Sequence, residues 1–345
     1  MEFRVERESL ETALHEAIAT LAATRSTRVD EQRFHWLYHA NPDGPAVLWS
    51  VREQRTGAMA GFTVCLPRRI LIEGKPAVAW NGADFSILPR FRTLGVALKL
   101  RRAAKIEIDA GVATLLFAHP NEKMQLIHEQ VGHVRVGRMV RYAIPLRLAG
   151  KLPRSVPAWA ASLADATAGR LVTFSALEAM HRPRHELRRA PELHFDSQHD
   201  RLFVDASHQR EIIGVRDAAY LDWRYRQYPS QRFQLIQAQQ SNRLQGYVIF
   251  TEEPEALRIQ DIFGNSEEVL LDLVVEVTRL ARKQRARSVS MALLEQSRLI
   301  PLLERIGFRQ RPDYSNMYCY AASGQLQLLA SAPNHWLIHV GDRDV

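Results

Sequence analysis

Cysteine is scarce in this sequence. Only two of the 345 residues are cysteines, Cys65 and Cys319, and they lie far apart in strand-like runs. Two such residues cannot build the disulfide framework of a small secreted protein, so we expect a reduced, cytoplasmic protein. Cysteine and histidine are nowhere clustered at the spacing of a zinc site, so no metal is expected.

Long apolar runs are also missing. A membrane-spanning helix needs about 18 or more consecutive apolar residues, and the sequence has no such run. The first residues mix glutamates with apolar side chains, which is unlike a secretory signal peptide. We therefore expect neither a membrane span nor a signal peptide.

What the sequence does contain is typical of a globular protein. Hydrophobic residues make up 46% and charged residues 24% of the chain, and its 345 residues suggest two domains of ordinary size. The formal net charge of +8 favours an anionic ligand, a nucleic acid or an acidic surface as partner, without choosing among them.

One stretch of the first half has the sequence pattern of a strand, a loop and a helix. Apolar residues between 77 and 87 predict a strand that ends at Pro89. From Gly95 onward, apolar residues recur at helical spacing, with lysine and arginine on the other face. The loop Arg92–Ala97 is therefore expected to lead into a helix.

This loop has the properties of a phosphate-binding site. The first N–H groups of a helix have no partner within the helix and lie at the positive end of its dipole. Gly95 and Ala97 have little or no side chain, so an anion can approach those N–H groups closely. An ordinary tight loop is the alternative interpretation of these six residues alone.

The pattern Arg-x-x-Gly-x-Ala at 92–97, after a strand that ends in proline, resembles the acyl-CoA pyrophosphate loop of the GCN5-related N-acetyltransferases. In that family a helix, a strand, an Asn-led helix and a closing Gly-Phe follow. Here a helix is again followed by a strand at 114–118 and a helix led by Asn121. The closing pair is Gly132-His133, so histidine replaces the phenylalanine of the family.

The resemblance covers roughly residues 1–146. It implies an α/β fold with a mixed, mostly antiparallel sheet that splays open at a CoA-binding cleft and is flanked by helices. It also implies that a CoA thioester, in the simplest case acetyl-CoA, is held by the strand end, the loop and the Asn-led helix. The residues concerned are Ile87, Leu88, Arg92, Thr93, Leu94, Gly95, Val96, Ala97 and Asn121.

The second half repeats features of the first in the same order. Trp36 matches Trp223 at an offset of 223 − 36 = 187, and Asp84 matches Asp261 at 261 − 84 = 177. Between these two matches, Gly61 corresponds to Gly246 at 246 − 61 = 185, and after them Glu129 corresponds to Glu304 at 304 − 129 = 175. Slowly drifting offsets are what loop deletions in a duplicated domain produce, so two tandem copies of one fold are predicted.

The copies differ at the loop. After Asp261 the second copy lacks Arg-x-x-Gly-x-Ala, and Glu267 and Glu268 stand where the helix N-terminus would meet phosphate. Carboxylates there repel a pyrophosphate. We therefore expect a CoA-binding domain at residues 1–146 and a degenerate copy at 196–345.

The segment between them, 147–195, is interpreted as the interdomain connection. It contains prolines and a basic run at 181–191, and residues 158–180 have helical character. A basic run is usually a solvated surface, so a nucleic-acid partner is not expected. The aromatic and apolar tail at 334–344 is expected to pack back on the body of the protein.

Acyl transfer from a thioester to an amine needs a base for the amine and a proton donor for the leaving thiolate. The resembling family often places a tyrosine donor four residues before the closing glycine, and His128 occupies that position. The ordinary histidine pKa of about 6.5 suits this role. Asp84 is the candidate base, because burial beside a cleft can raise its pKa. His119 is a third candidate, and purely structural roles for His128 and Asp84 are the alternatives.

The sequence thus predicts an N-acyltransferase, in the simplest case an N-acetyltransferase, that takes a CoA thioester and a small amine. One alternative is an aminoacyl transferase that takes aminoacyl-tRNA, like the peptidoglycan-bridge enzymes, which also use tandem copies of this fold. Another is a protein that binds acyl-CoA without turnover. The acceptor, the acyl chain length and the oligomeric state do not follow from the sequence.

Overall fold

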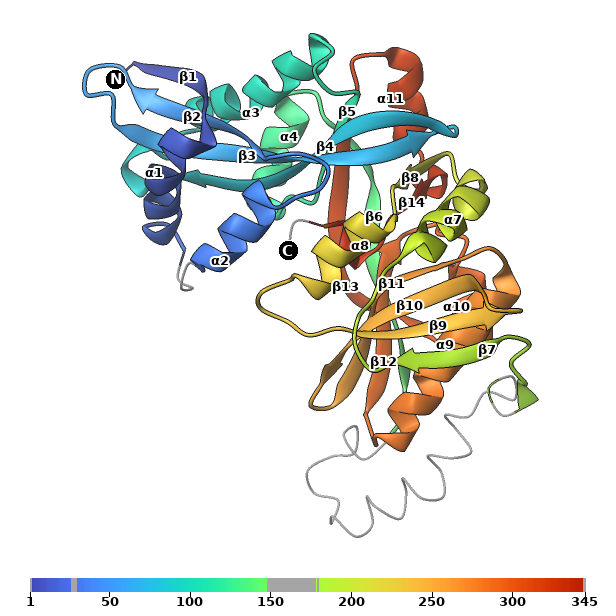
Figure 1. The fold of residues 1–345 in the computed structure, drawn as a ribbon. Coiled ribbons are helices and arrows are strands. Elements are labelled where there is room, and N and C mark those ends of the chain that lie inside the picture. The colour runs from blue at the N-terminus through green and yellow to red at the C-terminus, as the bar shows by residue number, and fades with distance from the viewer. Residues whose placement is uncertain (1, 26–29, 148–177, 179, 344–345) are drawn as a thin grey trace.

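The computed structural model describes residues 2–25, 30–147, 178 and 180–343. Its strands form one continuous mixed sheet with helices on both faces (Figure 1). Along the sheet the order is β1-β2-β3-β4-β5-β13-β6-β12-β11-β10-β9-β7, and two short strands, β8 and β14, pair beside it. The strands are β1 (Phe3–Glu8), β2 (Val47–Glu53), β3 (Met59–Ile72), β4 (Lys75–Ile87), β5 (Leu115–Ala118), β6 (Val134–Pro145), β7 (Glu186–Ala190), β8 (Ile212–Gly214), β9 (Gln234–Gln240), β10 (Arg243–Glu253), β11 (Ala256–Gly264), β12 (Ser288–Leu294), β13 (Arg309–Tyr320) and β14 (Trp336–Leu337).

Several helices begin where the sequence offers a capping side chain. Ser9, Thr93, Asn121 and Ser266 each accept a hydrogen bond from a backbone N–H of the first turn, which satisfies a donor that the helix leaves unpaired. Short π-helical turns, His35–His39 and Asp222–Arg226, extend α2 and α8. The α-helices are α1 (Leu10–Ala22), α2 (Glu31–Phe34), α3 (Leu94–Asp109), α4 (Glu122–Gln130), α7 (Ser197–Ala206), α8 (Ala218–Leu221), α9 (Glu267–Lys283), α10 (Ile300–Ile306) and α11 (Gly324–Ala330).

Strands β4 and β5 run parallel and then part. They pair from Ala79 opposite Leu115 to Gly82 opposite Ala118. There β5 ends, whereas β4 continues to Ile87. Beyond this last pair, residues 83–87 of β4 have no partner in β5, which leaves an opening in the sheet where the family resemblance implied one.

The last strand of each half lies in the middle of the sheet. Strand β6 pairs with β12 of the second half, and β13 pairs with β5 of the first half as well as with β6. The strand order consequently has the same pattern from either edge. The sequence led us to expect a sheet in each half, and the structure joins them into one, because each last strand pairs with a strand of the other half.

The two repeated tryptophans meet where the halves join. Trp36 and Trp223 stack with ring centroids 4.9 Å apart. The indole N–H of each donates to the backbone carbonyl of the other, at 2.7 and 2.9 Å. Both residues are buried. The two tryptophans that match in the sequence therefore form a reciprocal contact between the first and second halves of the chain.

Only part of the predicted connection lies within the described residues, and the predicted helix at 158–180 lies almost wholly outside them. The end of this segment is strand β7, which pairs with β9 at the edge of the sheet. His181 and His185 both contact the buried carboxylate of Asp272 in α9, at 2.5 and 2.8 Å. This part of the basic run thus attaches the segment to the second half.

The C-terminal tail packs back on the body, as predicted. Strand β14 pairs with β8, and Trp336, Ile338 and Asp342 are buried. At Asp342 the tail lies close to β4, since the Asn81 side chain donates to the carbonyl oxygen of Asp342 at 3.2 Å.

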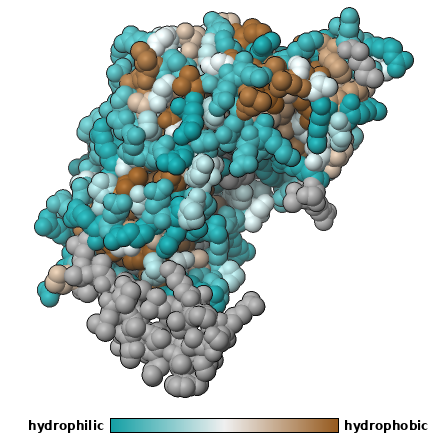
Figure 2. Space-filling view, turned by 180° about the vertical axis from the view of Figure 1, so that it is seen from behind, coloured by the Kyte–Doolittle hydropathy of each residue, from teal (hydrophilic) through white to brown (hydrophobic). Residues whose placement is uncertain are grey.

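The outer surface is mainly hydrophilic on the face shown in Figure 2, with hydrophobic residues in separate groups among polar ones. Scattered apolar residues are ordinary on protein surfaces. Among the helices of the described residues, none combines the length and the hydropathy that a membrane crossing requires.

Both cysteines are buried and unpaired, Cys65 in β3 and Cys319 in β13. Burial raises the pKa of the Cys65 thiol to about 12 and that of Cys319 to about 11. Since the thiolate is the reactive form, we expect neither residue to react with an aromatic disulfide reagent at about pH 8. Unfolding in guanidinium should release two thiols per chain, and fast reaction of the native protein would contradict this expectation.

Candidate functional site

The loop between β4 and α3 leaves two backbone donors open. Thr93 caps α3 by accepting from the Val96 N–H at 3.4 Å, and its carbonyl accepts from the Ala97 N–H at 3.2 Å. The N–H groups of Leu94 and Gly95 have no hydrogen-bond partner among the described residues. These two donors lie at the positive end of a helix of 16 residues, which is an arrangement that binds anions.

An open pocket lies at this helix end. Its walls include the basic side chains of Arg90 and Lys99, whose charge favours an anion. Nothing lies within 4 Å of the position that a Cβ atom would take on Gly95. The pocket is lined by Phe3, Arg90, Phe91, Thr93, Gly95, Val96 and Lys99.

The other predicted CoA-binding residues of this region surround the loop. The Leu88 N–H donates to the carbonyl of Ala60 at 2.9 Å, and Arg92 Nε donates to the carbonyl of Ile87 at 2.9 Å. Leu94 is exposed, whereas Val96 and Ala97 are buried on the face of α3 that packs on the sheet. The structure thus brings the strand end and the loop together. Asn121 is the cap of α4 and accepts from the Met124 N–H at 3.1 Å.

A β-bulge in β4 positions Asp84. Thr63 of β3 pairs with Phe85 and Cys65 pairs with Gly82, so one residue of β3 faces two of β4. Bulges of this kind re-aim side chains and are frequent beside active sites. Strand β11 has a register shift at the corresponding place, beside Asp261.

Asp84 is held by three side chains. Its buried carboxylate forms ion pairs with Arg25 and, at 3.1 Å, with Arg33, and it accepts from the Tyr38 hydroxyl at 2.7 Å. Burial raises the pKa of Asp84, but the two arginines and the Tyr38 hydrogen bond outweigh it and lower the pKa. The sequence analysis expected a raised pKa for Asp84, and this expectation is wrong, because the sequence did not show these partners. An ionised Asp84 is a weak base.

We expect Asp84→Asn to lower the free energy of unfolding at pH 7 by about 2–4 kcal/mol, because it leaves two arginines beside an uncharged group. Since the folded-state pKa is lowered, the carboxylate stabilises the fold fully above the unfolded pKa of about 3.9. That stabilisation is lost as the pH falls through the folded-state pKa. Urea unfolding at several pH values should show the difference between variant and wild type shrinking in acid.

The matched control is Asp205→Asn, because Asp205 forms an exposed pair with Arg243. It should change the free energy of unfolding by less than about 1 kcal/mol. An Asp84→Asn protein as stable as this control would show that the buried ion pairs contribute little.

His128 is buried and paired with another histidine. Its Nδ1 lies 2.8 Å from Nδ1 of His133, and the His133 ring stacks on Tyr320 of β13. Burial, followed by the charge of Arg101, lowers the pKa of His128 well below its usual value and that of His133 to about 3. The ordinary pKa assumed from the sequence therefore does not hold, and both rings are uncharged at neutral pH.

Asp84 and His128 lie on opposite faces of the sheet. The partners of Asp84 come from the side of α1 and α2, whereas α4, which carries His128, packs beside α3. The opening between β4 and β5 separates the two. A molecule reaching both side chains would have to pass through this opening.

Two polar residues lie at the opening itself. His119 was already a candidate from the sequence, whereas no sequence pattern marked Asn81. Asn81 precedes the last pair of β4 and β5, and His119 follows it. Among the described residues, neither ring nitrogen of His119 nor Oδ1 of Asn81 has a hydrogen-bond partner. Burial, followed by the charge of Arg343, lowers the pKa of His119 to about 3. No group of His, Cys, Asp and Glu that could hold a metal occurs among the described residues.

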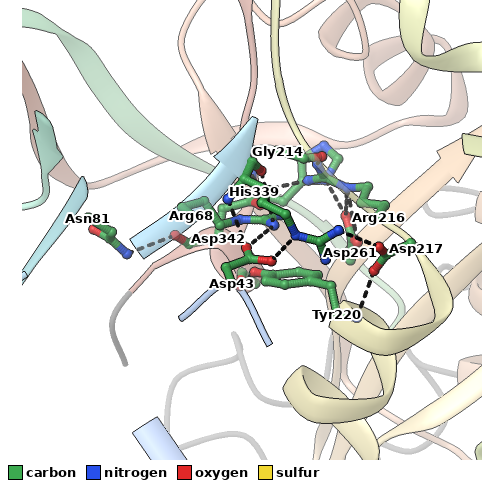
Figure 3. A network of polar contacts seen from close by, with 12 residues as sticks. Asp43, Arg68, Asn81, Gly214, Arg216, Asp217, Tyr220, Asp261, His339 and Asp342 are labelled. Atoms are coloured by element: carbon green, nitrogen blue, oxygen red, sulfur yellow. Dashed lines mark hydrogen bonds and ion pairs between the residues drawn. The ribbon is translucent and has the colours of Figure 1, made fainter. Parts of the chain in front are cut away.

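A buried ionic network ties the tail to both halves, and sequence patterns did not reveal it (Figure 3). Asp342 contacts Arg68 of the first half at 3.4 Å and Arg216 of the second half at 2.5 Å. Arg216 also reaches Asp261, which His339 contacts at 2.7 Å. The network fixes the tail beside the opening of the sheet.

Two solved structures share this architecture over nearly the whole chain. A protein of unknown function and probable N-acyltransferase from Enterococcus faecalis has a TM-score of 0.68 at 12% identity, covering 96% of this chain and 74% of that one. A GCN5-related N-acetyltransferase from Anabaena variabilis also has 0.68, at 14% identity, covering 96% and 75%. The chain has the fold of the GCN5-related N-acetyltransferases.

An enzyme named for a longer acyl group shares the same GCN5-related fold. The N-myristoyltransferase of Saccharomyces cerevisiae, solved with bound myristoyl-CoA, has a TM-score of 0.56 at 12% identity, covering 93% of this chain and 79% of that one. The sequence matches no protein-family model and no curated protein. The fold predicted from the loop motif is thus confirmed.

Proposed function

We propose that this protein transfers an acyl group from a CoA thioester to a primary amine. The observation that carries the proposal is the open N-terminus of α3 beside the parting of β4 and β5. The neighbours that share the fold include proteins named as N-acetyltransferases and an N-myristoyltransferase. Acetyl is the simplest acyl group, and a longer one is the alternative.

The pyrophosphate of CoA would accept hydrogen bonds from the N–H groups of Leu94 and Gly95. Arg90 and Lys99 stand at the same pocket and would complement its charge. The pantetheine would then run along the end of β4, past Ile87 and Leu88, toward the opening of the sheet.

In the reaction the amine nitrogen attacks the thioester carbonyl, the C–N bond forms and the C–S bond breaks. The amine loses a proton to the base, and the leaving thiolate takes one from water. The sequence made His128 the candidate proton donor, but its lowered pKa leaves the imidazole uncharged. We therefore propose that His128 stabilises the leaving thiolate by donating a hydrogen bond to the sulfur. Asp84 stays the predicted base, and its lowered pKa makes a water the alternative; His119, whose pKa is lowered to about 3, is no stronger as a base.

The second half would not bind CoA. Glu267 and Glu268 occupy the first turn of α9, where the first half has its open donors. Glu267 pairs with Arg305 at 2.6 Å and Glu268 with Arg184 at 3.1 Å. We propose that the halves are tandem copies and that the second is degenerate, shaping the acceptor side of the site.

Calorimetric titration with acetyl-CoA, octanoyl-CoA and myristoyl-CoA tests the binding step and the chain length together. Release of free CoA in the presence of a panel of amines then tests turnover. Binding without release by any amine would favour a protein that only binds acyl-CoA. No binding of any acyl-CoA would overturn the proposal.

A further inference from the structure

A small cavity lies where the two halves meet the C-terminal tail. Its volume is about 20 Å³, which is room for one small polar group. It adjoins the opening of the sheet through Asn81 of β4. Its walls include Leu37, Arg68, Asn81, Tyr220, Arg224 and Asp342.

One wall residue is a buried cation without an anion. The Arg224 side chain is 3% exposed, and among the described residues its guanidinium makes neither a hydrogen bond nor an ion pair. Its guanidinium instead lies over the rings of Trp36, at 5.5 Å, and Tyr228, at 5.9 Å. A buried charge is costly unless an anion or hydrogen bonds compensate it, so this position calls for an anionic partner.

The other charged side chains of the cavity, Arg68, Asp342 and Arg343, each have a partner. Asp342 is held by Arg68 and Arg216, and Arg68 is also paired with Asp43 at 3.1 Å. Oδ1 of Asn81 is buried without a partner and can only accept a hydrogen bond. The cavity therefore offers one uncompensated cation and one open acceptor.

The positive charge of Arg224 has no counterpart in the first half. Trp36 and Trp223 correspond at an offset of 187, so the residue of the first half that corresponds to Arg224 is Leu37. Both line the cavity. A ligand bound there would consequently be oriented, with its anionic end toward the second half.

We propose that Arg224 binds the carboxylate of the acyl acceptor, so that the acceptor is an amine bearing a carboxylate, such as an amino acid. The carboxylate alone would enter the cavity and lie on the guanidinium. The rest of the acceptor would stay outside, and its amine would donate to Oδ1 of Asn81 at the side that faces the opening of the sheet. Asn81 stands beside the opening where the thioester would arrive, so this orientation directs the amine toward the acyl carbon. The inference rests on the proposed acyltransferase function.

The test compares three amino acids, glycine, alanine and phenylalanine, each with its own carboxamide. Acyl-CoA binding is first measured for wild type, Arg224→Gln and Arg226→Gln. CoA release is then followed at about pH 8 over a range of each amine and expressed per unprotonated amine. Arg226 is the control because it lies on the same π-helical turn but is exposed and paired with Asp222.

We expect at least one amino acid to have a KM about 10–100-fold below that of its amide. The reason is that the uncharged amide cannot form the charge-assisted hydrogen bonds that a carboxylate forms with Arg224. Arg224→Gln should raise this KM to that of the amide, with kcat within about twofold. Arg224→Lys should keep part of the preference, and Arg226→Gln all of it. Acyl-CoA affinity should be unchanged in all three.

The inference is overturned if every amino acid reacts no better than its amide, or if Arg224→Gln keeps the preference. Turnover of neutral amines alone would overturn the inference and leave the proposed function intact. Failure of the wild type to bind any acyl-CoA would overturn the proposed function instead.

Discussion

Gly95→Glu should weaken acetyl-CoA binding by about a hundredfold or more. The new carboxylate would stand at the N-terminus of α3, where the open N–H groups of Leu94 and Gly95 lie. It would repel the pyrophosphate and compete for its donors, and the loss of two charge-assisted hydrogen bonds of about 1.5–3 kcal/mol each accounts for this effect. The fold should be unaffected, because nothing lies within 4 Å of the added Cβ.

The control for this variant is Gly324→Glu. Gly324 also lies in the first turn of a helix, α11, with open space at its Cβ position. Calorimetry should show unchanged affinity for this control and one CoA per wild-type chain. A folded Gly95→Glu protein with wild-type affinity, or a wild type with two equivalent sites, would refute the proposed CoA site.

His128→Ala should lower turnover by about 10²–10³-fold, the usual cost of losing one hydrogen-bond donor to a developing negative charge. The affinity for acetyl-CoA should hardly change, because the loop at α3 is untouched. The substitution also leaves Nδ1 of His133 without its partner, so the rate is expressed per folded molecule after a thermal unfolding curve.

The matched control is His133→Phe, which breaks the same histidine pair but keeps His128. Phenylalanine is also the aromatic residue that the resembling family places there. Its turnover should stay within about tenfold of wild type. Equal losses in both variants would mean that the pair supports the fold around α4 and that His128 does not act on the thiolate.

Local sequence determined the elements of the first half and the position of the loop. Thr93 and Asn121 cap α3 and α4 as their side chains allow. Gly132 and Gly307, at the ends of α4 and α10, both have positive φ angles, 90° and 112°, which glycine adopts without strain. These signals act over a few residues, so they can be read from the chain directly.

Local sequence does not determine that the last strand of each half pairs with a strand of the other half. The apolar alternation of β6 and β13 predicts strands but does not say which neighbours they have. Their partners, β12 and β5, are more than a hundred residues away in the chain. Pairing over such distances depends on how the two halves pack, and the sequence does not encode it in any local pattern.

The chemistry of the candidate residues was likewise decided by tertiary structure. Asp84 and His128 were found from their places in the sequence, but their pKa values depend on Arg25, Arg33 and Arg101, which the fold brings beside them. No motif marks Arg224, and only its packing on Trp36 of the other half makes it a buried, uncompensated charge. Side-chain type is local information, whereas burial and charge environment arise from residues that are distant in sequence, so only the assembled fold sets them.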